Sequence, residues 1–291
     1  MIEKYLIADF LLELDYPGDS VVQTKLADYA TNADECVTHI KISIGYTSAD
    51  IPVKKENITQ ISAGSYYYSM QDSDVVFYYD QNVSKVIAKT EYSNDYKNVK
   101  IDIFELKKVL GVEDSQLTYN ILGRIFGYVV QMHGGFVFHA SSVCYSDAGV
   151  AFSAKSGTGK STHTALWLQN FDGCFILNDD APLIYKSKDE SFNISGTPWA
   201  GTTGINHNVS VPLKAIVSLE RGANNSIESI APGESINFLF EGVKSPLTGL
   251  MLSNILETFN SLFANVPIYK LKCNMDPSAA HTACKTIFAK F

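Results

Sequence analysis

The strongest constraint on the fold lies in the middle of the chain, where a glycine-rich segment separates two apolar patterns. Residues 150–152 read VAF, residues 154–161 read AKSGTGKS, and an apolar helical pattern follows over about 160–171. A buried strand that passes through a glycine loop into a helix brings backbone N–H groups and the positive end of a helix dipole to one point. The segment therefore predicts a strand–loop–helix unit that holds an anion.

The same segment fits the phosphate-loop (P-loop) template G-x-x-x-x-G-K-[ST], except that Ala154 stands in the place of the first glycine. In this template the lysine, here Lys160, reaches the β and γ phosphates, and the hydroxyl of Ser161 ligates Mg²⁺. We expect ATP or GTP and Mg²⁺ as cofactors, since an ordinary glycine loop rarely has these flanks. The expected binding residues are Ser156, Gly157, Thr158, Gly159, Lys160, Ser161 and Thr162.

Two adjacent carboxylates, Asp179 and Asp180, follow an apolar run over residues 174–178. At the end of a buried strand such a pair is costly unless something compensates its charge. A bound cation does so, and one carboxylate then remains to accept a proton from an attacking hydroxyl. The alternative is a solvated turn before Pro182.

The strand before the loop arrives through a short turn, because residues 146–149 separate two apolar runs at about 136–145 and 150–154. A turn of this length pairs the two strands antiparallel, which disfavours the parallel layout of the common GTPases and motor ATPases. His139 lies on the first of these runs. A functional histidine and a satisfied core histidine are equally open at this position.

The flanking regions differ in character. Alternating residues at 40–44 and 99–103, with tyrosine-rich runs at 65–68 and 75–79, predict a β-rich N-terminal module over 1–112, its tyrosines half buried in an antiparallel sheet. A base-stacking platform is the alternative reading of these tyrosines. An amphipathic helix over about 115–133 leads into a mixed α/β domain over 113–291, with later helices after Pro246 and Pro277.

Net charge and cysteine spacing limit which partners and which cellular compartment we expect. The 23 lysines and arginines against 31 acidic residues give a net charge of −8 without a basic run, which argues against nucleic acid or an anionic membrane as partner. No apolar run is long enough to span a membrane, the first residues do not form a secretory signal, and the five cysteines show no C-x-x-C spacing. We therefore expect a cytoplasmic protein.

The order of these pieces resembles the nucleotide-binding core shared by the HPr serine kinase/phosphorylases and the phosphoenolpyruvate (PEP) carboxykinases. The resemblance rests on HASSV at 139–143, SGTGKST at 156–162 and NDD at 178–180. The later blocks GTPWAG at 196–201 and VPLKAI at 211–216 are similar to a largely uncharacterised bacterial branch of HPr-kinase-like proteins. The resemblance covers about residues 134–225 and leaves the N-terminal module outside.

This resemblance implies an α/β fold of the α+β type, with a mixed sheet around the P-loop core, and an ATP- and Mg²⁺-dependent kinase. It implies that Asp179 activates the acceptor hydroxyl, that Asp180 ligates the metal beside Ser161, and that His139 faces the transferred phosphoryl group. The division of roles between the two aspartates stays open. Arg221 is the arginine placed to meet a γ-phosphate, with an ordinary surface arginine as the equal alternative.

The expected acceptor is a hydroxyl, either the serine of a protein or peptide or that of a small metabolite. Thr162 stands where HPr kinases carry Glu, and Thr202 stands where the related branch often carries Lys. These departures favour a second reading, a nucleotide-binding regulatory or sensor module without transfer activity. A carboxykinase-like lyase is disfavoured, because Arg124 and Arg221 are the only arginines to hold a carboxylate substrate. A homo-oligomer stays open.

Overall fold

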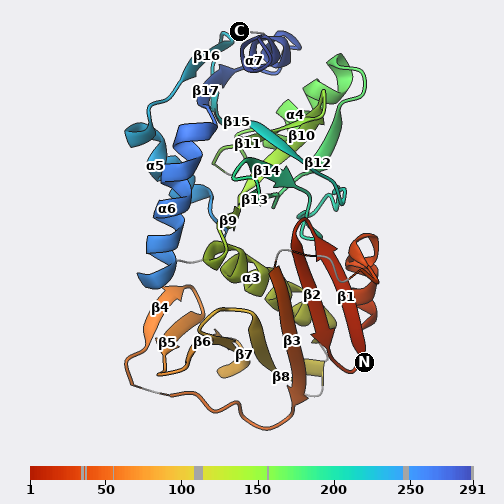
Figure 1. The fold of residues 1–291 in the computed structure, drawn as a ribbon, viewed down its shortest axis with the longest axis vertical. Helices are drawn as coiled ribbons and strands as arrows, with labels where there is room; N and C mark the ends of the chain where they lie inside the picture. Colours follow the sequence, from red (N-terminus) through yellow and green to blue (C-terminus); the bar gives the residue numbers. More distant parts are fainter. Residues whose placement is uncertain are drawn as a thin grey trace. The chain divides into compact units, whose positions relative to one another are not determined.

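The computed structural model describes residues 1–33, 36, 38–54, 56–107, 114–155, 157–244 and 249–289. The chain divides into two compact units, the first made of Met1–His133 with Ser245–Ser253 and the second of Gly134–Lys244 with Asn254–Phe291. Each unit contains one mixed β-sheet (Figure 1). The predicted mixed α/β class is confirmed, and α3 (Asp114–Met132) falls in the first unit rather than beyond a boundary at 112/113.

The first unit is built on an eight-stranded sheet in the order β1-β2-β3-β8-β7-β6-β5-β4, in which β2/β3 and β3/β8 are parallel and the other pairs antiparallel. The strands are β1 (Ile2–Ile7), β2 (Phe10–Asp15), β3 (Thr38–Thr47), β4 (Thr59–Ser62), β5 (Ser65–Ser69), β6 (Ser73–Asp80), β7 (Lys85–Ser93) and β8 (Asn98–Phe104). Short helices α1 (Ser20–Lys25) and η1 (Ala27–Tyr29) join β2 to β3.

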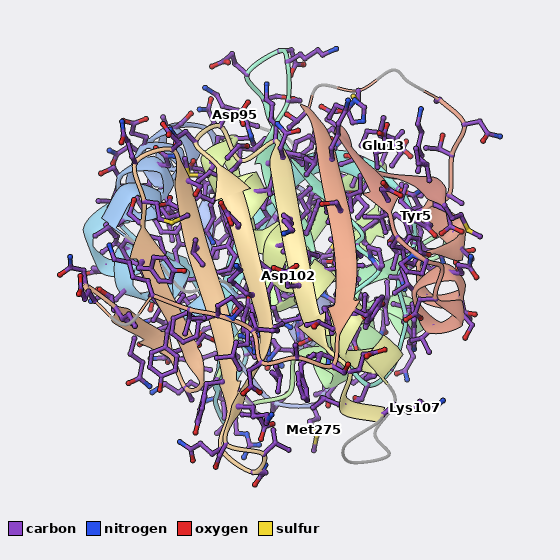
Figure 2. All side chains as sticks on the ribbon, turned by 90° about the horizontal axis from the view of Figure 1, so that it is seen from below. Tyr5, Glu13, Asp95, Asp102, Lys107 and Met275 are labelled. Carbon is purple, nitrogen blue, oxygen red and sulfur yellow. The ribbon has the colours of Figure 1, made fainter. Side chains whose placement is uncertain are left out.

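The two faces of this sheet differ as the alternating pattern predicts. In Figure 2 its strands run side by side, and Asp102 of β8 lies near the middle of a face that carries polar side chains. The opposite side chains are buried, and α3 packs its predicted apolar stripe there: Phe126 meets Phe10 edge-on at 5.9 Å. The tyrosine runs form β5 and β6, where Tyr66 stacks on Phe77 at 5.2 Å. Their reading as a half-buried antiparallel sheet is confirmed.

The second unit holds nine strands, with the main order β12-β10-β11-β15-β14-β13-β9 and with β17 and β16 added beside β15. They are β9 (Gly135–Val137), β10 (Ala140–Tyr145), β11 (Ala148–Ser153), β12 (Phe175–Asn178), β13 (Leu183–Lys186), β14 (Phe192–Ser195), β15 (Ser210–Arg221), β16 (Ser226–Ser229) and β17 (Ile268–Cys273). The remaining helices are α4 (Lys160–Asn170), α5 (Pro232–Gly242), α6 (Gly249–Asn265) and α7 (Ser278–Ile287).

β10 and β11 form the predicted antiparallel hairpin. Its turn has two residues rather than four, Ser146 and Asp147, both with positive φ (48° and 57°), as a tight hairpin whose twist matches its strands requires. The other neighbour of β11 is β15, which runs parallel to it. With a partner on each side, β11 is a central strand, which explains why residues 150–152 are fully buried.

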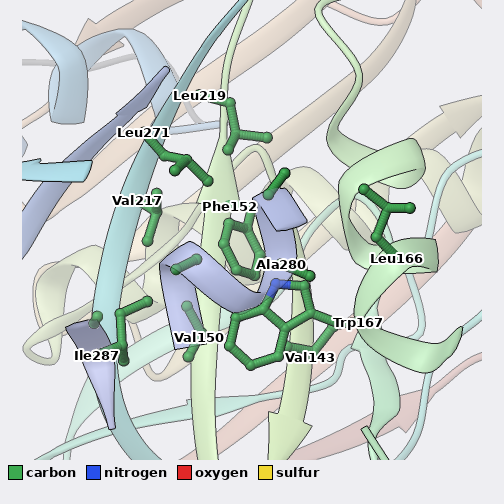
Figure 3. Packing of buried hydrophobic residues seen from close by; sticks show 13 residues of the cluster. Val143, Val150, Phe152, Leu166, Trp167, Val217, Leu219, Leu271, Ala280 and Ile287 are labelled. Carbon is green, nitrogen blue, oxygen red and sulfur yellow. The ribbon is translucent and has the colours of Figure 1, made fainter. Parts of the chain in front are cut away.

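The core behind β11 is aromatic. Trp167 of α4 is fully buried and lies 5.6 Å from Phe152 of β11, within a cluster that α7 closes with small side chains such as Ala280 (Figure 3). At about 25 cal/mol per Å² of apolar surface, burying an aromatic side chain of this size contributes roughly 4–6 kcal/mol. This packing holds the first turns of α4 firmly against the sheet.

Three expectations need correction or comment. The strand expected over 136–145 breaks at residues 138–139, because Phe138 bridges Val243 and His139 donates its N–H to the carbonyl of Gly242 instead of continuing the ladder. Helix α5 was not expected, although Pro232 at its first position is a helix-start signal. The start expected for a helix at Pro246 lies outside the described residues. None of the described helices has both the length and the apolar character that a membrane span requires.

Candidate functional site

The glycine-rich loop runs from the end of β11 to the start of α4, as predicted. Gly157 and Gly159 have φ of 75° and 121°, a region that only glycine enters without strain, and here it reverses the chain into the helix. Gly159 is the N-cap of α4, and no side chain caps the helix. The first N–H groups of α4 therefore point into the loop without an acceptor from a capping residue, which is the usual arrangement of an anion site. Ser156 lies outside the described residues.

Lys160, the first residue of α4, reaches back over the loop. Its Nζ lies 3.2 Å from Nε2 of His139 and 3.4 Å from the carbonyl oxygen of Ala154. Burial lowers the pKa of this lysine, while Asp180 and Asp179 act in the opposite direction. The ammonium group therefore stands over the loop, between the carbonyl of Ala154 and the His139 ring.

His139 faces this lysine. Burial, together with the neighbouring charges of Lys160 and Lys244, lowers the pKa of His139, so the imidazole is neutral at neutral pH. Its Nε2 accepts a hydrogen bond from Lys160, and the 3.5 Å separation between that same atom and Oδ1 of Asp180 is therefore not an ion pair. A neutral histidine beside the lysine adds no charge of its own.

The carboxylate of Asp179 connects β12, β10 and α4 through hydrogen bonds. Asp179 follows β12, is 7% exposed, and accepts hydrogen bonds from Ser141 of β10 (2.6 Å) and from Ser161 of α4 (3.2 Å). The Ser141 hydroxyl also lies 2.9 Å from that of Thr164. The carboxylate thus links the loop helix to the two strands behind it. Ser141 lies in the HASSV segment that carries the resemblance, but the sequence assigned it no role of its own.

Asp180 points to a different set of partners. It forms an ion pair with Lys244 and lies near His139. The side chains of Asp180, Lys244 and His139 are 29%, 31% and 37% exposed. Lys244 follows the end of α5 and is 64 residues away in sequence. Because a single lysine after an unexpected helix has no pattern around it, the sequence could not identify it.

Asn178 sets the different directions of the two aspartates. Its Oδ1 accepts the backbone N–H groups of Asp180 (2.9 Å) and Ala181 (2.6 Å), and its Nδ2 donates to the carbonyl of Thr197 (2.9 Å). An asparagine that accepts from the N–H groups two and three residues further on forms a local turn at the end of the strand. The turn sends Asp179 toward Ser161 and Asp180 toward Lys244.

The oxygens suited to Mg²⁺ are those of Ser161 and Asp179. Their 3.2 Å separation is close to the roughly 3 Å between adjacent ligands of an octahedral ion with metal–oxygen distances of about 2.0–2.1 Å. Among the described residues no group of three or more His, Cys, Asp or Glu is placed to hold a metal ion alone. The residues present fit an ion that takes most of its ligands from phosphate and water. Asp180, expected as the ligand, lies with Lys244 instead.

Arg221, at the end of β15, contacts the loop itself. Its Nη2 donates to the carbonyl of Gly157 (2.5 Å) and its Nε to that of Thr158 (3.4 Å). The guanidinium therefore braces the loop from one side. Arg124 belongs to the first unit, where it donates to Ser65 at 3.0 Å.

Two cavities adjoin the loop in the second unit, and both have Thr158 and Arg221 in their walls. The larger has a volume of about 820 Å³. Its lining includes His139, Ser153, Lys155, Glu220, Phe238 and Glu241. The smaller, of about 430 Å³, lies on the side of the loop that faces the first turns of α4.

The structure thus brings together His139, Lys160, Ser161, Asp179 and Asp180, five residues singled out from the sequence, around one loop. Thr162 lies in the first turn of α4 with its side chain exposed. Compared with protein-family models and with curated proteins, the chain matches none.

Proposed function

We propose that this protein is a kinase that transfers the γ-phosphoryl group of ATP or GTP, with Mg²⁺, to a hydroxyl group. The observation that carries the proposal is the meeting of an uncapped helix N-terminus, Lys160 and the Ser161–Asp179 pair at one glycine loop. Each part has a known use with phosphates: N–H groups and the helix dipole bind the anion, and the lysine neutralises it.

The metal would be held by Ser161 and Asp179, because these two oxygens already have the spacing of adjacent ligands. When bound, Mg²⁺ would neutralise charge on the β and γ phosphates. Ser141 would keep the carboxylate of Asp179 oriented, since it donates to the oxygen that does not face Ser161. The geometry supports exchanging the roles first expected for the two aspartates.

Asp180 is then the carboxylate left for proton transfer. In the proposed step the acceptor oxygen forms a bond to the γ-phosphorus while the bond from that phosphorus to the β–γ bridging oxygen breaks. The hydroxyl proton passes to Asp180, and the nucleoside diphosphate leaves. Lys160, which is 3.2 Å from His139, would stabilise the charge that develops on the transferred group.

The acceptor would enter through the larger cavity, because His139 lines it. The wall carries two carboxylates, Glu220 and Glu241, and two cations, Lys155 and Arg221, so its charges balance and suit an acceptor without a large net charge. A protein or peptide serine and a small uncharged metabolite remain the two candidate classes of acceptor.

A carboxykinase-like lyase receives less support, because both arginines are engaged elsewhere: Arg124 with Ser65 and Arg221 with the loop carbonyls. A nucleotide sensor would use the same loop without transfer. The retained Asp180, held at the loop by Lys244, favours the kinase over the sensor.

The test combines a binding and a transfer measurement. Calorimetry with Mg²⁺ and ATP gives the dissociation constant, and γ-labelled ATP with an extract of the source organism gives transfer to an acceptor. Lys160→Ala should weaken nucleotide binding and lower transfer by about 10²–10³-fold, as the loss of a charge-stabilising group does. Lys188→Ala, an exposed lysine on the turn between β13 and β14, is the matched control and should change neither.

Two variants distinguish the roles of the two aspartates, because each should lose a different step. Asp179→Asn should raise the Mg²⁺ concentration needed for nucleotide binding, whereas Asp180→Asn should bind MgATP normally and lose transfer. Tight binding by the wild type without transfer to any acceptor and without hydrolysis would contradict the kinase and favour the sensor. Turnover only in the presence of a keto acid would favour the lyase.

A further inference from the structure

The smaller cavity lies beside the glycine-rich loop, on the side away from His139. Its lining includes Thr162 and Leu166 of α4, Leu219 of β15, and Cys273, Asn274 and Met275 at the end of β17; we call it the lateral cavity. Leu166 and Leu219 are labelled in Figure 3 at the edge of the aromatic core. Its volume of about 430 Å³ lies within the usual range of small-molecule sites.

The direction of a bound triphosphate decides what reaches this cavity. The transferred phosphate must lie near Lys160 and His139, and His139 lines the larger cavity. The opposite end of a triphosphate that follows the loop then leaves past Gly159 and Thr162, which line the lateral cavity. A nucleoside attached to that end would enter it.

The wall of the lateral cavity is apolar or uncharged over much of its extent. His163, which belongs to this lining, is 3% exposed, and its Nε2 accepts the indole N–H of Trp167. Burial raises the pKa of the Cys273 thiol, which therefore stays protonated. Met275, at the margin of the cavity, is 78% exposed, so its side chain is accessible to a ligand that enters there.

Several polar groups of the wall are already engaged. Asn274 donates from Nδ2 to the carbonyl of Ala223 (3.1 Å), and its Oδ1 accepts the N–H of Asp276 (3.0 Å). Arg221 is bonded to the loop carbonyls, and Glu220 lies 3.7 Å from the ammonium of Lys270. Strong discrimination between two ligands of similar shape needs polar groups dedicated to their differences, which apolar contacts do not supply.

We propose that the lateral cavity receives the nucleoside of the triphosphate and holds its base by apolar contact, so that adenine and guanine nucleotides bind with similar affinity. This inference rests on the proposed function, because it requires a triphosphate at the loop.

The test is calorimetry on the full chain with Mg²⁺ and three probes: ATP, GTP and inorganic tripolyphosphate. ATP and GTP should have dissociation constants within about tenfold of each other, and tripolyphosphate should bind at least about tenfold more weakly than either. Met275→Ala should weaken ATP and GTP about threefold to tenfold and leave tripolyphosphate unchanged. Met275→Trp should tighten both nucleotides, and its indole fluorescence should change when they bind.

Met70→Ala, an exposed methionine of the first unit, is the matched control and should alter no affinity. Equal affinity for tripolyphosphate and ATP, equal effects of Met275→Ala on all three probes, or an ATP-to-GTP ratio above about 100 would each overturn the inference. In those cases triphosphate binding itself, and with it the proposed function, would survive. If none of the three probes binds, both proposals are wrong.

Discussion

The buried histidine of α4 offers a quantitative test of the packing around the loop. His163 is 3% exposed, its Nε2 accepts the indole N–H of Trp167 at 3.1 Å, and its ring lies edge-on to Phe152 at 4.7 Å. Burial lowers its pKa from the usual 6.5 to about 4. Replacing it by glutamine removes the titrating group and keeps an oxygen that can accept the indole N–H.

The magnitude follows from proton linkage. Above about pH 6.5 the imidazole is neutral in both the folded and the unfolded chain, so it adds no pH dependence. As the pH falls from about 6.5 to about 4, the unfolded chain binds a proton that the folded chain does not, and the free energy of unfolding decreases. Each tenfold change in a dissociation constant corresponds to about 1.4 kcal/mol, so the total loss is about 3 kcal/mol.

The assay is urea unfolding of the wild type and His163→Gln at a series of pH values between 7.5 and 4. Tryptophan fluorescence is suitable, because Trp167 and Trp199, the two tryptophans of the chain, both belong to the second unit. The difference between wild type and variant is the quantity to plot, since the titration of His139 and other groups is common to both.

The difference in the free energy of unfolding between the wild type and His163→Gln should be constant above about pH 6.5. As the pH falls to 4, the wild type should lose about 3 kcal/mol relative to the variant. At pH 7.5 the difference in the free energy of unfolding reflects only the replacement of the side chain and no protonation. A difference that stays constant within about 1 kcal/mol over the whole range would show that the imidazole is not held neutral by burial. The packing argument for this part of α4 would then fail.

Two further predictions concern packing and buried hydrogen bonds. In Gly242→Ala the new methyl group would overlap the ring of Phe138, so urea unfolding should show a free energy of unfolding lower by about 1–3 kcal/mol. The control is Gly233→Ala, where the added carbon meets nothing and the stability should not fall. Equal losses in the two variants would contradict the steric explanation. In Asp74→Ala the hydroxyls of Tyr67 (2.8 Å) and Tyr96 (2.6 Å) lose their hydrogen-bond acceptor. The free energy of unfolding should fall by about 1–3 kcal/mol for each hydroxyl left buried, and the thermal midpoint measured by circular dichroism should fall with it. An unchanged midpoint would contradict this prediction.

Part of the site was predictable because its signals are local in sequence. Gly157, Gly159, Lys160 and Ser161 are contiguous, and a strand that enters a glycine loop before a helix has few other ways to fold. The antiparallel hairpin before the loop was predictable for the same reason, since only the short turn segment 146–149 separates its two apolar runs. The aspartate pair was recognisable by its place at the end of an apolar run.

The partners of these residues were not predictable. Ser141 and Lys244 reach the aspartates from 38 and 64 residues away. Ser141 lies in the HASSV segment, but nothing in that segment pairs it with Asp179, and Lys244 lies in no recognisable pattern. Arg221 was expected at a γ-phosphate, and the parallel pairing of β15 with β11 brings it to the loop carbonyls. Pairing between distant strands depends on which apolar faces cover each other, and periodicity carries no information about that choice.

By itself the sequence determined the glycine loop, the helix that follows it and the residues that converge there, because backbone conformation and helix polarity are set by neighbours along the chain. The tertiary structure alone decided which aspartate faces Ser161 and which faces Lys244, and it decided that His139 is neutral. Those properties depend on burial and on charges contributed by distant segments. They exist only once the sheet has assembled around the loop.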